Sequence, residues 1–152
     1  MAIKYHPNPG DILICDFKGM IPPEMVKRRP VINLTPRYRR SQGLCTVVPI
    51  STTAPQAIQS WHTRVHVNLP NPFSSPEAWA KCDFLYTVSY ERLFLFHQGK
   101  QPDGKRNYVY PTLSEKELDQ VWRCVLEGLG RHDIVKTLDA LDAPIDENDC
   151  PF

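Results

Sequence analysis

Proline restricts how this chain can fold more than any other residue does. The chain has 152 residues and 15 prolines, about a tenth of the sequence and roughly twice average usage. Each proline fixes one φ angle and removes one backbone N–H donor, so little room is left for a bundle of long helices. The length corresponds to a single domain that can bury a real hydrophobic core.

Charge is distributed unevenly along the chain, although the net charge is only +1. Residues 1–40 carry a net charge of +5, residues 41–110 carry +2 and residues 111–152 carry −6. A basic front half can attract a polyanion such as a nucleic acid. Ordinary solvated faces explain the same asymmetry, so charge alone does not choose between these interpretations.

Cysteine and histidine spacing gives no sign of a metal site. The five cysteines are odd in number, and none forms a CxxC or CxxH spacing. His62 and His66 are four residues apart, but they flank an alternating run, in which such residues lie farther apart than on a helix. The sequence also shows no glycine-rich nucleotide motif, signal-peptide pattern or membrane-length apolar segment. We therefore expect a soluble, cytoplasmic protein that uses neither a metal nor a cofactor and does not contact a membrane.

Short apolar runs between turn residues predict a mainly β structure. Pro49 is expected to stop the third strand, and Val65, Val67 and Leu69 alternate onto one face of the fourth. Gly and Pro residues at 97–105 indicate a hairpin tip. The expected strands cover residues 11–17, 29–34, 44–48, 63–69, 78–84 and 93–96.

Helices are expected only near the C-terminal end. Ser114 and Glu117 form a capping-box pattern, and the apolar residues that follow have 3.6-residue spacing. The pattern predicts one α+β domain over residues 1–141, in which a packing helix covers one face or end of a small β-barrel. Its parts are a barrel at 8–113, the packing helix at 114–129 and a weaker helix at 131–141, followed by an acidic mobile tail at 142–152.

Basic, hydroxyl and carboxylate residues gather at the ends of three predicted strands, at 27–29, 51–53 and 81–83. Simpler roles exist for them. Arg29 can pair with Glu24 across a turn, and Ser51 can serve the turn itself. Asp83 can balance a neighbouring cation. Trp61 and Trp79 are two further candidates, since either can stack on a nucleic-acid base or seal the insertion at 70–77.

These groups form part of four motifs that occur in order over residues 8–130, ahead of the amphipathic helix. The motifs are Gly10-Asp11-Ile12 through Phe17, Glu24 with Arg29-Pro30 five residues later, Val47-Val48-Pro49-Ile50-Ser51-Thr52, and Lys81-Cys82-Asp83. In this order they resemble the PemK/MazF family of toxin endoribonucleases. The resemblance implies an SH3-like β-barrel of the CcdB/PemK type with an amphipathic C-terminal helix.

The resemblance also implies a function. Family members are type II toxins that cut single-stranded RNA without a metal, using the ribose 2′-hydroxyl as the nucleophile. They are usually homodimers, and a separate antitoxin lays a peptide over the active groove. This chain is therefore expected to bind single-stranded RNA and a cognate antitoxin and to form a homodimer.

Site residues follow from the matching positions. Arg29, Ser51 and Asp83 are the expected catalytic residues: a guanidinium for the charged phosphate, a hydroxyl donor and a base. The expected RNA-binding residues are Glu24, Lys27, Arg28, Thr52 and Lys81.

The sequence departs from the family in several places. Pro23 stands where some members have a histidine, and Lys81 replaces an arginine, which keeps the charge but loses the planar fork. The segments at 70–77 and 98–105 are longer than expected. Two alternatives remain open, a non-enzymatic gyrase poison of the CcdB type and a catalytically silent SH3-like binding module.

Overall fold

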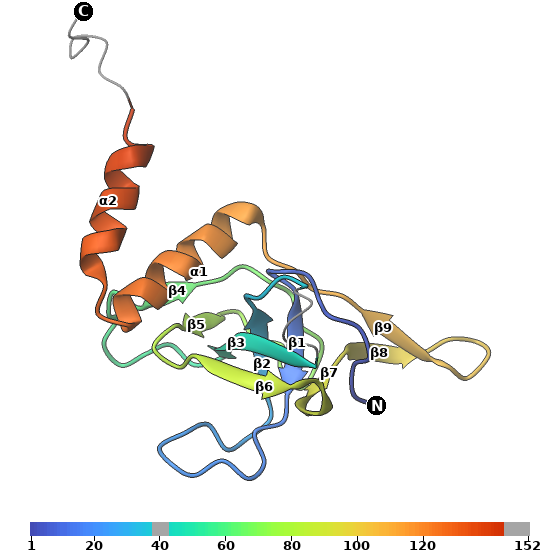
Figure 1. Cartoon of the computed structure of the whole chain (residues 1–152). Coiled ribbons are helices and arrows are strands. Elements are labelled where there is room, and N and C mark those ends of the chain that lie inside the picture. The colour runs from blue at the N-terminus through green and yellow to red at the C-terminus, as the bar shows by residue number, and fades with distance from the viewer. Residues whose placement is uncertain (38–42, 145–152) are drawn as a thin grey trace, which may run out of the picture.

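The fold is a mainly antiparallel β-structure followed by two C-terminal helices (Figure 1). The computed structural model describes residues 1–37 and 43–144. Its elements, in chain order, are β1 (Ile12–Cys15), β2 (Arg29–Asn33), β3 (Leu44–Ser51), β4 (His62–Arg64), β5 (Trp79–Lys81), β6 (Tyr86–Ser89), the 3₁₀ turn η1 (Tyr90–Arg92), β7 (Leu93–Phe94), β8 (Phe96–Lys100), β9 (Arg106–Val109), α1 (Glu115–Gly128) and α2 (His132–Asp142).

Strand β3 is the centre of the sheet. The strand order is β4-β5-β3-β2-β1-β7, and β6 also pairs with β3, while β8 and β9 form a separate two-stranded sheet. One edge of β3 pairs with β2, and the other edge pairs first with β6 and then with β5. The end of β3 thus lies between β2 and β5, which brings chain segments around residues 30, 50 and 80 together.

The two faces of this sheet pack against different parts of the chain. Helix α1 lies over one face, where its Val121, Cys124 and Val125 pack with Ile32 and Ile50 in the larger hydrophobic cluster (Figure 1). The other face carries a second cluster. The buried members of the second cluster are Leu13, Cys15, Phe17, Val31, Cys45, Val47, Val88 and Leu93. The long loop between β1 and β2 extends from the sheet on this side (Figure 1).

Helix α1 begins as its sequence predicts. Ser114 is the N-cap, and its Oγ accepts a hydrogen bond of 3.2 Å from the backbone N–H of Glu117. The helix ends at Gly128, which packs so closely on the chain after β5 that a Cβ there would lie 2.9 Å from the carbonyl oxygen of Cys82. The C-terminal end of α1 is thereby fixed against residues 82 and 83.

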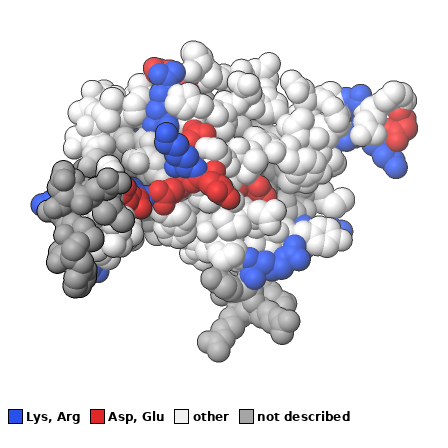
Figure 2. Space-filling model, turned by 90° about the horizontal axis from the view of Figure 1, so that it is seen from above, with Lys and Arg blue, Asp and Glu red and all other residues white. Residues whose placement is uncertain are grey.

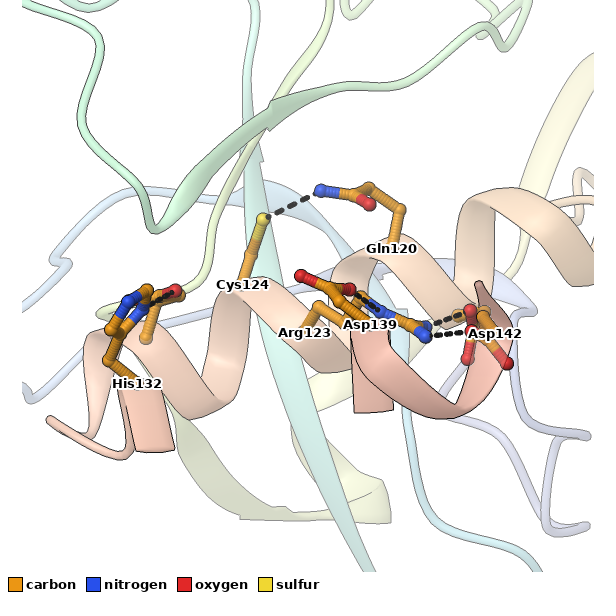
Figure 3. Close-up of polar contacts among 8 residues, drawn as sticks. Gln120, Arg123, Cys124, His132, Asp139 and Asp142 are labelled. Atoms are coloured by element: carbon orange, nitrogen blue, oxygen red, sulfur yellow. Dashed lines mark hydrogen bonds and ion pairs between the residues drawn. The ribbon is translucent and has the colours of Figure 1, made fainter. Parts of the chain in front are cut away.

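Helix α2 is held to α1 by one arginine. The Arg123 guanidinium is largely buried and donates hydrogen bonds to three carboxylates, those of Asp119 on α1 and of Asp139 and Asp142 on α2 (Figure 3). The bond to Asp139 is 3.1 Å long. At the other end of α2, His132 pairs with Glu127 at 2.6 Å. Polar contacts at both ends therefore orient α2 on α1.

The predicted mainly β fold with two C-terminal helices is confirmed, but several element bounds are wrong. Pro49 does not stop the third strand, which continues to Ser51, because Pro49 lies where β3 changes partner from β6 to β5 and a missing N–H donor costs little there. The strand expected at 63–69 is only three residues long, although Val65 and Leu69 are buried as the alternation predicts.

Two strands, β6 and β9, were not among the expected strands. Most of the acidic tail expected at 142–152 lies outside the described residues, and α2 reaches Asp142. Within residues 1–37 and 43–144, no helix combines the length and apolar character needed to cross a membrane.

Candidate active site

Register brings Arg29 and Ser51 to the same face of the sheet. Strands β2 and β3 pair Asn33 with Val47 and Val31 with Pro49. Two residues further along the same register, Arg29 comes opposite Ser51. Since directly opposed residues point to one face of an antiparallel sheet, both side chains lie on the face that α1 does not cover. The arginine and hydroxyl of the predicted site are thus neighbours across two strands.

The Arg29 side chain is half-buried and incompletely paired. Its backbone opens β2 opposite Cys15 of β1. The guanidinium Nε is fully buried and has no hydrogen-bond partner among the described residues. No ion pair joins Arg29 to Glu24 among the described residues, so the simple salt-bridge role is not realised.

Ser51, at the end of β3, is 7% exposed and takes part in a turn. Its hydroxyl donates to the carbonyl oxygen of Thr53 at 3.0 Å and accepts from the Thr53 N–H at 3.2 Å. This is the turn role that the sequence left open. The hydroxyl proton is therefore already engaged in the free chain, and Ser51 can donate to a phosphate only if that bond to Thr53 is exchanged.

Strand β5 extends the same face beyond Ser51. Trp79 lies directly opposite Ser51, while the intervening Ala80 faces the core under α1. Lys81 follows two residues after Trp79, so it shares the face of Ser51, and it is half-buried opposite His62 of β4. Within residues 1–37 and 43–144, the buried indole N–H of Trp79 also has no hydrogen-bond partner. Arg29, Ser51, Trp79 and Lys81, called here the β2–β3–β5 face, form the candidate site.

The loop between β1 and β2 is anchored beside this face. The backbone N–H of Met25 donates to the Tyr86 hydroxyl of β6 at 3.0 Å, and Tyr86 in turn stacks on Phe84. Glu24 precedes Met25 and is exposed, as is Lys27. Both predicted residues therefore lie on an exposed loop with a fixed attachment point. Tyr86 gave no sequence signal for this role, because the strand that carries it was not recognised.

Two other predicted residues, Arg28 and Thr52, make contacts of their own. The Arg28 guanidinium lies 5.0 Å from the centre of the Phe94 ring on β7, an edge strand on the far side of β1. Thr52 contributes its carbonyl oxygen, which accepts a hydrogen bond of 3.1 Å from the Ser75 hydroxyl. Arg28 is thus engaged in a cation–π contact, and Thr52 ties the loop after β3 to the predicted insertion at 70–77.

Asp83 is exposed and lies in the turn after β5, where its backbone packs on Gly128. The structure records no hydrogen bond or ion pair between its carboxylate and any described residue. The preceding Cys82 is 1% exposed, and hydrogen bonding with Cys124 together with burial raises the pKa of its thiol. The middle residue of the Lys-Cys-Asp motif is therefore part of the core and is not an available nucleophile.

Charge distinguishes the two faces of the molecule. Figure 2 looks down on the α1 face and shows a band of acidic side chains across its centre. The acidic residues that line a cavity between β4, α1 and α2 are Glu117, Asp119, Asp139 and Asp142. Strands β2, β3 and β5 contribute only cationic, neutral polar and apolar side chains to the opposite face. Arg123 pairs with three of the four carboxylates, and Arg64 and Lys116 line the same cavity, so the acidic band is partly neutralised. The β2–β3–β5 face, which carries Arg29 and Lys81 and no acidic side chain from its strands, is the better match for a polyanion. In the described residues, no group of three histidine, cysteine or acidic side chains has the arrangement of a metal site.

A family comparison decides what this arrangement belongs to. The profile of the PemK-like, MazF-like toxins of type II toxin–antitoxin systems matches residues 8–128. The chain belongs to this family. The match contains the whole β2–β3–β5 face and all of α1, whereas α2 lies beyond it.

Two sequence relatives extend the comparison. The chain is 29% identical to the protein YifN of Escherichia coli (strain K12) over 150 residues, which cover 85% of this chain and 95% of YifN. It is 33% identical over 112 residues to a protein of Haemophilus influenzae, with 64% of this chain and 75% of that protein covered. Neither relative has an assigned activity, so they support the family and add no function.

Solved structures confirm the MazF-like fold. MazF from Deinococcus radiodurans superposes with a TM-score of 0.56 at 18% identity, covering 84% of this chain and 99% of that one. A mycobacterial endoribonuclease in complex with its cognate antitoxin gives a TM-score of 0.54 at 14% identity, with 82% and 96% covered. At such low identity these matches establish the fold alone.

Proposed function

We propose that this toxin is a sequence-selective endoribonuclease that cuts single-stranded RNA by attack of a ribose 2′-hydroxyl, without a metal ion. The single observation that carries the proposal is the placement of Arg29. The strand register makes Arg29 a cross-strand neighbour of Ser51 on the face away from α1, and its buried Nε has no partner among the described residues. Burying an unsatisfied donor is costly, so a strongly hydrogen-bonding partner such as a phosphate is favoured there.

The reaction needs only proton transfers and charge stabilisation. A base removes the 2′-hydroxyl proton, and the resulting oxygen attacks the adjacent phosphorus. The bond from phosphorus to the 5′-oxygen then breaks as an acid protonates that oxygen, which leaves a 2′,3′-cyclic phosphate and a 5′-hydroxyl. The extra negative charge on the phosphorane has to be met by fixed donors in the transition state.

The roles proposed for the individual residues follow from their positions and their chemistry. Arg29 binds the phosphate with its planar fork and stabilises the phosphorane. Ser51 donates to a phosphate oxygen after exchanging its bond to Thr53. Asp83 acts as the base, from the exposed turn that follows Lys81. Lys81 and the loop that carries Glu24 and Lys27 bind the flanking RNA.

The biological setting completes the proposal. The chain acts in the cytoplasm, forms a homodimer and is inhibited by a cognate antitoxin. The structures of a mycobacterial endoribonuclease and of the Deinococcus radiodurans MazF, each solved with its antitoxin, support the last point by likeness. An acidic antitoxin segment would bind the same cationic face as RNA and would therefore exclude it.

The test is cleavage of a long single-stranded transcript in EDTA by the wild-type protein and by Arg29→Ala. We expect the wild type to cut at defined sites and to leave 2′,3′-cyclic phosphate ends. Loss of one preorganised donor lowers kcat by about 10²- to 10³-fold in comparable sites, so Arg29→Ala should lose activity on that scale.

Arg106→Ala is the matched control, because it removes the same charge from the exposed strand β9. It should cut at the wild-type rate. An Arg29→Ala protein as active as this control would refute the assignment of the site. Wild-type protein that binds the transcript but never cuts it would instead identify a silent binding module.

A further inference from the structure

The feature that the proposed reaction leaves unexplained is Trp79. Among buried side-chain nitrogens and oxygens of the described residues, only Arg29 Nε and Trp79 Nε1 lack a hydrogen-bond partner. Both belong to residues that flank Ser51, one on each neighbouring strand. An unsatisfied buried donor costs about 1–3 kcal/mol, so folded proteins keep few of them. Two such donors beside one hydroxyl indicate a ligand with acceptors at two places.

The spacing of strands places the second acceptor. Arg29 and Trp79 lie on strands that are both adjacent to β3, so their backbones are about 10 Å apart. A single phosphate bound by Arg29 is therefore too small to reach both donors. The group that meets the indole N–H belongs to a neighbouring part of an extended ligand.

The chemistry around Trp79 indicates what that ligand is. Lys81 follows on the same face, and Arg64 of β4 lies directly opposite Trp79. An aromatic ring beside cationic side chains is the combination with which proteins bind single-stranded nucleic acid, because bases stack on the ring and phosphates pair with the cations. Trp79 itself is half-buried and its N–H is fully buried, so a ligand reaches the nitrogen only after a local rearrangement.

We propose that Trp79 is a substrate-binding residue that holds the nucleotide next to the scissile phosphate, with its indole N–H donating to an oxygen of that nucleotide. This inference rests on the proposed function for the identity of the ligand. It adds a contact that neither the family motifs nor the reaction chemistry requires. Trp79 thereby sets the register of the RNA relative to Arg29 and Ser51.

The variant Trp79→Phe tests this, because phenylalanine keeps an aromatic ring and removes the N–H donor. The probe is a fluorescently labelled, random-sequence RNA with 2′-O-methyl groups throughout, which has no 2′-hydroxyl to react. Loss of one hydrogen bond should weaken its dissociation constant about 5- to 10-fold in fluorescence anisotropy. Trp122→Phe, on the exposed side of α1, is the matched control and should bind like the wild type.

An isosteric replacement separates the hydrogen bond from the shape of the ring. In a Trp61→Phe, Trp122→Phe background, biosynthetic replacement of the remaining indole by benzothiophene keeps the bicyclic ring and removes only the N–H. It should reproduce the weaker binding, and the melting temperature of the free protein should not fall, because the buried N–H that it removes has no partner among the described residues. If both altered proteins bind the probe within two-fold of their parents, Trp79 is not a substrate-binding residue.

The binding assay also distinguishes this inference from the proposed function. Wild-type protein that binds the probe but cuts no natural RNA would refute the nuclease and leave the Trp79 contact supported by its own variants. Active wild type with an unchanged Trp79→Phe protein would refute only the Trp79 contact. Wild type that binds an acidic peptide but not the RNA probe would overturn the Trp79 assignment.

Discussion

Gly128→Ala is expected to destabilise the protein, contrary to the usual effect of this substitution in a helix. Alanine is favoured over glycine in helices by at most about 1 kcal/mol, and Gly128 has helical backbone angles at the last position of α1. A Cβ at this position would however lie 2.9 Å from the carbonyl oxygen of Cys82 and 3.0 Å from the Cα of Asp83. Both are backbone atoms, so they cannot rotate away as a flexible side chain would.

The magnitude follows from these opposing effects. Overpacking of this kind destabilises a protein by about 1–3 kcal/mol. The preference of helices for alanine over glycine offsets up to about 1 kcal/mol of that loss. The net loss of unfolding free energy should be about 1 kcal/mol, which lowers the melting temperature of a chain of this size by about 2–4 °C.

Calorimetry or thermal circular dichroism measures this directly. Lys116→Ala is the control, since it introduces alanine at an exposed position of the same helix and should change stability by less than about 0.5 kcal/mol. A Gly128→Ala protein that melts at or above the wild-type temperature would show that α1 does not press on residues 82 and 83 as described.

Two further predictions concern α2 and the buried thiols. Arg123→Leu removes the shared partner of Asp119, Asp139 and Asp142. Hydrogen–deuterium exchange of the α2 amides should therefore rise at neutral pH, while exchange in β1 to β3 stays unchanged. If α2 is equally protected in the variant and the wild type, Arg123 does not attach it to α1. Burial raises the pKa of Cys15 from 9.0 to about 12 and that of Cys45 from 9.0 to about 11. The unfolded chain therefore loses these thiol protons at lower pH than the folded chain, and the free energy of unfolding should fall as the pH rises from 9 towards 11. In denaturant titrations under reducing conditions, the free energy of unfolding of Cys45→Ala should fall less steeply with pH. An equally steep fall in the variant would contradict the prediction.

Local sequence signals predicted the helices well, because their causes lie within a few residues. The cap at Ser114 and the apolar spacing of α1 act at short range, and the structure places both as predicted. Strand limits depend on distant partners instead. Pro49 fits within β3 only because the partner strand changes there, and the run after Arg64 stops pairing although its apolar residues are buried as expected.

The candidate site could be predicted only in part for the same reason. The motifs named Arg29 and Ser51, and the β2–β3 register places them on one face. They could not show that the Ser51 hydroxyl bonds to Thr53 or that Arg28 is held over Phe94, because these contacts depend on how loops and edge strands pack. Nor could they single out Trp79, since its place opposite Ser51 follows from the pairing of β3 with β5.

Strand β5 connects the stability of the core to the proposed chemistry. Its Ala80 and the following Cys82 pack beneath α1, whereas Trp79 and Lys81 face the site. A strand of three residues has little stiffness of its own, so its position is set by the helix that presses on it. Gly128→Ala should therefore reduce RNA cleavage by more than its small loss of stability explains, because at a temperature where the variant is fully folded the added methyl still displaces β5. Arg123→Leu, which loosens α2 on the far side of α1, should leave cleavage unchanged.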